Sequence, residues 1–289
     1  MINELSNIAR YVLGWDRAGR DFRVYPDDVF VVSYPRSGNT WTRFLIANLI
    51  YRDEPVTFAN VEERIPDIYT SSKRGLKKLS RPRIIKTHEY FDPRYKKLVY
   101  IVRDPRDVAL SYYHFHVKFR RIEEGYPIEE YIPHFIAAEF DPYGSWAENV
   151  ASWMVNRMES SSFLLLRYED MLENPQQELN KAATFLGIQS TLEQIDRAVT
   201  LSSSDKMQAL EKAQGKNWAT TKKTRQDKPF VRAAMSGGWQ SGLPERSVAA
   251  IEAAWGPLMN LLGYRPITRG SGDRNHVLET LLGNPARRT

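Results

Sequence analysis

The eleven residues VVSYPRSGNTW, numbered 31–41, say more about the fold than any other segment of the chain. The apolar run that leads into them, DDVFVVSY (27–34), is rich in β-branched residues and predicts a buried strand. Residues 37–51 then carry apolar residues at helical spacing and predict a helix. A strand that turns through a small loop into a helix presents backbone N–H groups at the positive end of the helix dipole. The segment therefore predicts an anion-binding turn.

The same alternation of strand and helix continues along the chain. Further strands are predicted over 81–90, 96–105 and 161–170, and further helices over 104–116, 174–188 and 244–264. Repeated strand–helix units predict an α/β three-layer sandwich with a mostly parallel central sheet. Because no repeat or low-complexity linker interrupts the pattern, we predict a single domain over 1–289. Ligands of such sheets bind at the carboxyl ends of the strands.

The composition narrows the class of protein. The 289 residues include 41 Lys and Arg against 35 Asp and Glu, a net charge of +6 that mildly favours anionic ligands. The basic residues are spread along the chain, so no nucleic-acid partner is expected. The lack of cysteine excludes disulfides, thiolate metal sites and cysteine nucleophiles. No apolar run reaches the roughly 18 residues of a membrane span, and the N-terminal residues lack a secretory pattern, so a cytoplasmic protein is expected.

Each residue of the turn has a use in anion binding. Gly38 allows close approach of the backbone, Ser37 and Thr40 offer hydroxyl groups, and Arg36 offers a permanent charge. Asn39 stands where the phosphate loop of nucleotide hydrolases has its lysine, so a nucleoside triphosphate would lack its main cation here. An ordinary strand-to-helix turn with an exposed arginine is the alternative.

Five segments, in order, resemble the cytosolic-type sulfotransferase family. SYPRSGNTW (33–41) resembles its 5′-phosphosulfate loop, IKTHEYF (85–91) its catalytic Lys-Thr-His strand, and RDPRDVALSYYHF (103–115) its 3′-phosphate motif. LLLRYEDMLENP (164–175) resembles its Tyr-Glu-Asp segment, and FVRAAMSGGWQ (230–240) its late glycine-rich motif. The resemblance implies a P-loop-like phosphosulfate-binding loop in the α/β sandwich.

The resemblance also implies a donor, 3′-phosphoadenosine 5′-phosphosulfate (PAPS), with the 3′,5′-bisphosphate PAP as product. The matching donor-binding positions are Arg36, Ser37, Gly38, Asn39, Thr40, Trp41, Arg103, Ser111, Tyr168, Ser202 and Arg232. Arg103 and Ser111 would bind the 3′-phosphate, and Trp41 and Tyr168 would contact the adenine. The alternatives are a surface ion pair for Arg103, a helix–sheet contact for Ser111, and core packing for the two aromatic residues.

The resemblance places the chemistry on Lys86 and His88, which project from the same face of their strand because they are two residues apart. His88 would take the proton of an acceptor hydroxyl, and a hydrogen-bonded histidine at a strand end is the alternative. Lys86 and Arg36 would stabilise the charge on the leaving phosphate, with Arg36 as an electrostatic clamp. No metal is expected, because the histidines and carboxylates show no ligand spacing.

The expected function is sulfuryl transfer from PAPS to the hydroxyl or phenol of a small molecule. The alternatives are a P-loop small-molecule kinase, which would lack its lysine and an evident magnesium-binding Asp, and a non-catalytic nucleotide-binding protein. The acceptor pocket is expected from 52–80, 116–145 and 212–240, with 212–232 as a mobile flap. The acceptor and the oligomeric state are not predicted.

Two further features of the sequence bear on the site. Ala233 and Ala234 replace the usual Lys and Gly of the late motif, so Arg232 is expected to carry more of the 3′-phosphate binding. His114 and His116 are interpreted as surface or acceptor-pocket residues rather than metal ligands, because a spacing of two does not face one side of a helix.

Overall fold

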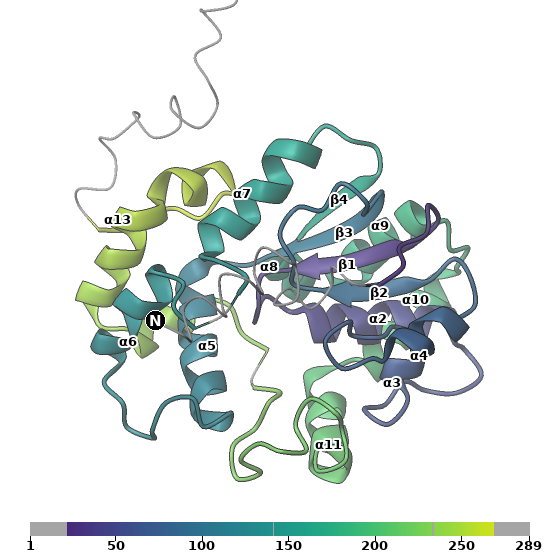
Figure 1. Cartoon of the computed structure of the whole chain (residues 1–289), viewed down its shortest axis with the longest axis horizontal. Helices are drawn as coiled ribbons and strands as arrows, with labels where there is room; N and C mark the ends of the chain where they lie inside the picture. Colours follow the sequence, from purple (N-terminus) through teal and green to yellow (C-terminus); the bar gives the residue numbers. More distant parts are fainter. Residues whose placement is uncertain (1–21, 141, 233, 269–289) are drawn as a thin grey trace, which may run out of the picture.

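The computed structural model describes residues 22–140, 142–232 and 234–268. Its centre is a parallel sheet with the order β2-β1-β3-β4 (Figure 1). The strands are β1 (Val29–Ser33), β2 (Ile84–Thr87), β3 (Lys97–Val102) and β4 (Phe163–Arg167). All three pairings are parallel, and each strand lies inside its predicted range. The predicted parallel sheet is therefore confirmed.

Helices connect and cover the strands. They are α2 (Asn39–Ile50), α3 (Val61–Arg64), α4 (Lys73–Lys78), α5 (Pro105–Lys118), α6 (Ile128–Ile136), α7 (Trp146–Arg157), α8 (Tyr168–Glu173), α9 (Pro175–Leu186), α10 (Leu192–Leu201), α11 (Ser204–Gln214), α12 (Trp239–Gly242) and α13 (Glu245–Leu261). The ends follow local signals: Asp104 caps α5 by accepting the Arg106 N–H at 2.9 Å, and α9 ends at Gly187 with φ 76°. The four predicted helices are confirmed.

The two faces of the sheet bury separate apolar clusters. Alternate residues of β1 point to opposite faces, and Phe30, Val31 and Val32 are all fully buried. Val31 packs in the cluster formed with α2, α9 and α10. Phe30 and Val32 pack in the cluster formed with α5, α6, α7 and α13, most of which lie left of the sheet in Figure 1. Helices on both faces of one sheet confirm the predicted α/β three-layer sandwich.

A short segment extends the sheet beyond β2. Lys86 donates its N–H to the Pro66 carbonyl at 2.8 Å, and Ile68 donates to the Lys86 carbonyl at 3.2 Å. Asp67 thereby forms an isolated parallel bridge with Lys86, which brings its side chain to the same edge of the sheet. Within the three described ranges, no helix combines the length and the apolar character that a membrane crossing requires.

Candidate active site

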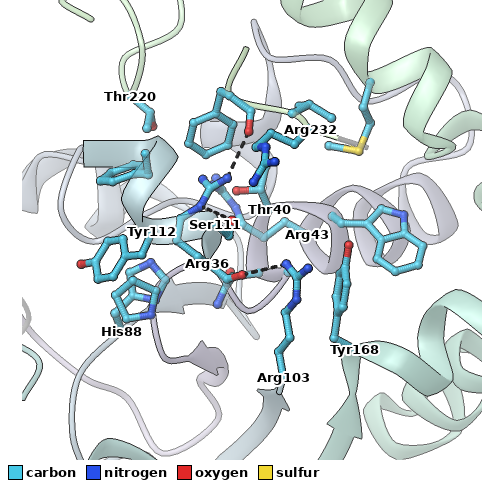
Figure 2. Close-up of a pocket in the computed structure, with 18 of the residues that line it drawn as sticks. Arg36, Thr40, Arg43, His88, Arg103, Ser111, Tyr112, Tyr168, Thr220 and Arg232 are labelled. Carbon is cyan, nitrogen blue, oxygen red and sulfur yellow. Dashed lines mark hydrogen bonds between the residues drawn. The ribbon is translucent and has the colours of Figure 1, made fainter. Parts of the chain in front are cut away.

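A cavity of about 430 Å³ opens at the carboxyl ends of the strands (Figure 2). Its walls come from the loop after β1, from β2, α5 and α8, and from residues 204–238. It brings together most of the predicted site residues: Arg36, Gly38, Asn39, Thr40, Trp41, Lys86, His88, Arg103, Ser111, Tyr168 and Arg232. Ser37 and Ser202 lie outside its lining.

The loop after β1 has the geometry of an anion-binding turn. Gly38 caps α2 with φ 99°, in the left-handed region that favours glycine. A Cβ there would lie 2.6 Å from Cδ2 of Tyr168, so glycine is also required for the close approach of that ring. The first turn of α2 has no acidic residue to occupy its N–H groups. The buried Ser37 Oγ has no hydrogen-bond partner among the described residues. The loop therefore has hydrogen-bond donors, the N–H groups of the first turn of α2 and the Ser37 hydroxyl, available to bind an anion.

Asn39 has a structural use for its side chain. Its Nδ2 donates to the Val31 carbonyl at 3.1 Å and to Ser33 Oγ at 3.2 Å, and the residue is only 4% exposed. These bonds fasten the start of α2 to β1. The residue at the position of the lysine in nucleotide hydrolases therefore stabilises the loop here. Its backbone N–H is the donor that remains for an anion, and its buried Oδ1 has no hydrogen-bond partner among the described residues.

Arg36 is held over the cavity by four contacts. Its Nε donates to Ser111 Oγ at 3.2 Å, and its Nη2 donates to the Phe230 carbonyl at 3.1 Å. The guanidinium carbon lies 4.6 Å from the centre of the Phe230 ring and 5.2 Å from that of Phe115. Burial, and then repulsion from other arginines, lowers the pKa of Arg36 to about 10. The group still carries its charge at neutral pH.

Arg103 and Arg232 supply the repulsion and complete a cationic cluster, as Figure 2 shows. Arg103 donates to the Arg36 carbonyl at 3.3 Å and to the Met235 carbonyl at 3.0 Å, while its Nε is buried without a partner among the described residues. Arg232 is exposed and makes no hydrogen bond or ion pair within the described part of the chain. Three guanidinium groups that repel one another form a site suited to a multiply charged anion.

The late motif is anchored on α5. Asp107 accepts the N–H groups of Gly237 at 2.7 Å and Trp239 at 3.0 Å, which ties residues 237–239 to the helix that carries Ser111. Ala234 lines the cavity and is exposed, and Ala233 lies outside the described residues. Because this motif lacks its usual lysine, Arg232 is the cation that the motif contributes to the cavity.

Aromatic rings form one wall of this cationic end. Trp41 and Tyr168 meet edge to face with centroids 5.8 Å apart, and the Arg103 guanidinium lies 4.1 Å from the centre of the Tyr168 ring. Ser202 is fully buried: its carbonyl accepts the Trp41 Nε1–H at 3.0 Å and its hydroxyl accepts from Asn48 at 3.1 Å. Ser202 thus fixes the orientation of Trp41 and does not itself line the cavity.

His88 is oriented by the strand next to it. Its Nδ1 lies 2.7 Å from the Ser33 carbonyl, and because a carbonyl only accepts, Nδ1 carries the proton and Nε2 carries the free electron pair. Burial, and then the charge of Lys86, lowers the pKa of His88 well below its usual 6.5. The side chain is therefore a neutral imidazole at pH 7, with Nε2 available to take a proton.

Three residues around His88 and Lys86 were missed by sequence reasoning. The Tyr69 ring stacks nearly parallel to His88 with centroids 5.9 Å apart, and its hydroxyl accepts the His88 N–H at 2.8 Å. The Tyr143 ring meets His88 at 5.5 Å, and Asp67 Oδ2 lies 2.9 Å from Lys86 Nζ. All three come from the loops predicted for the acceptor pocket, but no motif marks them individually.

The interpretation of the two α5 histidines needs a correction. His114 is exposed, as expected for a surface residue, and lies outside the cavity lining. His116 is fully buried, where its Nδ1 meets the Tyr131 hydroxyl at 3.1 Å and its ring packs on Tyr112 and Phe140. Placing His116 at the surface or in the acceptor pocket was wrong, because apolar packing between α5 and α6 encloses it.

Comparisons with known proteins agree on one family. Residues 26–263 match the family model of the sulfotransferase domain. Sulfotransferase 1B1 of Mus musculus is 31% identical, covering 83% of this chain and 85% of its own. Sulfotransferase 1A1 of Canis lupus familiaris is 32% identical, covering 77% and 80%.

Two solved structures share the fold. Retinol dehydratase in complex with androsterone and inactive cofactor PAP has a TM-score of 0.70 at 20% identity, over 90% of this chain and 88% of that one. Mouse sulfotransferase SULT7A1 complexed with PAP has a TM-score of 0.66 at 24% identity, over 82% and 85%. With the motifs, the site and the family model in agreement, the chain belongs to the sulfotransferase family.

Proposed function

We propose that the chain transfers the sulfuryl group of PAPS to a hydroxyl or phenol group of a small molecule, with His88 as the general base. The observation that carries this proposal is the hydrogen bond from His88 Nδ1 to the Ser33 carbonyl, which leaves Nε2 free of a proton on a side chain that lines the cationic cavity. A base and an anion site in one cavity suit the attack of a neutral hydroxyl on a charged donor.

The cavity fits the donor. PAP is bound in the two related structures, and PAPS supplies the sulfuryl group as the co-substrate. The loop 36–41 would hold the 5′ end, while Arg103, Ser111 and Arg232 would hold the 3′-phosphate. The unpartnered Ser37 Oγ, Arg103 Nε and Thr220 Oγ1 support a polar ligand of this kind.

The reaction needs one proton transfer and one exchange of bonds. The acceptor hydroxyl loses its proton to His88 Nε2 as its oxygen bonds to sulfur, and the bond from sulfur to the bridging phosphate oxygen breaks. Lys86 and Arg36 offset the charge that grows on that oxygen. The products are a sulfated acceptor and PAP.

The acceptor would lie against the rings of Tyr69 and Tyr143, which contact His88, and of Phe115, which lines the same cavity. The related retinol dehydratase has been solved with androsterone, a small molecule, in the complex. We also propose that the chain forms a single domain, that the protein is cytoplasmic, and that residues 212–232 form a mobile flap.

The test is to incubate the protein with sulfur-labelled PAPS and a panel of small phenols and alcohols, and to titrate PAP by calorimetry with and without magnesium. Labelled product, and PAP binding that does not require magnesium, support the proposal. Phosphate transfer from ATP with magnesium would instead favour the kinase alternative. Tight PAP binding without transfer to any acceptor would favour the non-catalytic alternative.

A further inference from the structure

Lys86 is paired with a buried carboxylate that no motif marks. Its Nζ lies 2.9 Å from Asp67 Oδ2, and the two side chains are only 7% and 9% exposed. The pairing follows from the backbone, because Asp67 forms the parallel bridge with Lys86 at the edge of β2. Both side chains line the cavity; Lys86 lies on β2, and His88 follows the last residue of that strand.

Asp67 is itself held in place on several sides. Its Oδ1 accepts the Tyr69 N–H at 3.0 Å, and its own N–H donates to Glu62 Oε2 at 2.8 Å. Glu62 Oε1 in turn lies 3.0 Å from Arg43 Nη2 and accepts the Trp218 Nε1–H at 3.2 Å. The carboxylate therefore meets Lys86 from a fixed position that α2, α3 and the segment after α11 all support.

We infer that Asp67 is a positioning residue for sulfuryl transfer, which keeps Lys86 charged and fixes its ammonium group beside His88. The inference rests on the proposed function, since it assumes that Lys86 stabilises the leaving phosphate. It gives Asp67 an indirect role: the carboxylate acts through the lysine and touches neither donor nor acceptor.

The charges around Lys86 explain why a partner is required. Burial lowers the pKa of Lys86 below 10.5, and Arg43 on α2 lowers it further. Asp67 and Glu62 oppose this effect, and Asp67 makes the larger contribution. His88, directly after the strand, is neutral and adds no compensating charge. Without Asp67, the buried ammonium group would face Arg43 with Glu62 and the Tyr69 ring, whose centre lies 4.7 Å from Nζ, to stabilise its charge, so its pKa would fall further.

The charge on Lys86 also affects the protonation of His88, which follows the end of β2. Transfer needs a protonated Lys86 and an unprotonated His88 at the same pH. The charge of Lys86 is one of the causes that lower the pKa of His88. A protonated Lys86 therefore opposes the protonation of His88.

The decisive variant is Asp67→Asn, which keeps the shape and removes the charge. We expect kcat to fall on the order of 10- to 100-fold, while the Kd for PAP changes by less than about twofold. The alkaline limb of the pH–rate profile should move to lower pH, because Lys86 loses its proton earlier. Asp67→Glu should restore part of kcat and move that limb back.

The matched control is Asp28→Asn. Asp28 forms an equally buried ion pair with Arg83, whose side chain is 1% exposed, but neither residue lines the cavity. Its loss should lower the Tm without moving the pH profile. If Asp67→Asn also lowers only the Tm, Asp67 has a purely structural role and the inference is wrong.

A second readout does not depend on activity. Competitive labelling of lysines with acetic anhydride over a pH series, followed by mass spectrometry of the Lys86 peptide, measures the pKa of Lys86 directly. We expect a drop of about one unit or more in Asp67→Asn, and an unchanged value overturns the inference. If the wild-type protein transfers no sulfate but labelling shows the drop, the proposed function fails and the coupling of the two residues stands.

Discussion

The two ends of the cavity are built in different ways. What we propose as the donor end is lined by the loop after β1, Arg103, Tyr168 and Arg232, and what we propose as the acceptor end is lined by Asp67, Tyr69, Lys86, His88 and Tyr143. At the donor end, burial and then repulsion between the guanidinium groups lower the pKa of Arg36. At the acceptor end, the charge of Lys86 is balanced by Asp67, and the imidazole is neutral.

This difference in charge balance suggests that one end of the cavity binds the donor and the other end carries out the proton transfer. The three guanidinium groups of the donor end repel one another, so we expect that end to bind an anionic ligand. A paired lysine and a histidine of low pKa have fixed protonation states at neutral pH, which suits the proton transfer that we propose for the acceptor end. Substitutions at the two ends should therefore separate kcat from the affinity for PAP.

The largest effect should come from His88→Ala. Loss of the base should lower kcat by at least about 100-fold and leave the Kd for PAP unchanged, because His88 belongs to the acceptor end. Steady-state kinetics with labelled PAPS and calorimetry with PAP measure the two quantities. Activity close to that of the wild type would show that another group takes the proton.

The donor end could be predicted from sequence far better than the acceptor end. Its proposed binding groups lie in the loop after β1, such as Gly38, or directly after a strand, such as Arg103, and strand ends meet at one edge of a parallel sheet. Asp67 and Tyr143 come from irregular loops, so only the fold brings them to His88. Ser202 was predicted as a donor-binding position, and its hydroxyl bonds to Asn48, a contact between α2 and the end of α10 that no sequence pattern reveals.

Arg103→Ala should weaken PAP binding with little change in kcat at saturating PAPS. A hydrogen bond to a charged group contributes about 1.5–3 kcal/mol, so the Kd should rise roughly 10- to 100-fold. Calorimetry at two salt concentrations measures it, and the exposed Arg246 on α13 provides the control Arg246→Ala. An equal loss in both variants would show that only net charge matters.

Gly38→Ala should damage the donor end through its backbone. The left-handed φ of 99° costs an alanine about 1–2 kcal/mol, and the new Cβ would in addition meet Tyr168 at 2.6 Å. Gly187→Ala is the matched control, because its φ is 76° and nothing lies within 4 Å of its Cβ. Both variants should lower the Tm, but only Gly38→Ala should also weaken PAP binding, by about tenfold. If Gly38→Ala and Gly187→Ala bind PAP equally well, the close approach of residue 38 to Tyr168 has no role in the donor site.

Arg36→Lys should have a milder effect. An ammonium group keeps the charge, but it cannot bond to Ser111 and the Phe230 carbonyl through a rigid fork as the guanidinium group does. We expect the KM for PAPS to rise about threefold with kcat preserved, whereas Arg36→Met should lose most of the transfer. A collapse of kcat in Arg36→Lys would mean that the fork itself places the donor for attack.

The smallest effect should be that of mild acid, and it tests how the two ends influence each other. Burial, Lys86 and Arg36 lower the pKa of His88 well below 6.5, so the base stays unprotonated as the pH falls from 7.5 to 6.5. A histidine with the ordinary pKa of about 6.5 would be half protonated at the end of that range and would halve kcat/KM. We expect a change well under twofold, measured in buffers of constant ionic strength. A twofold loss would place the pKa of His88 near its ordinary value, and the cations around it would then have no net effect on the base.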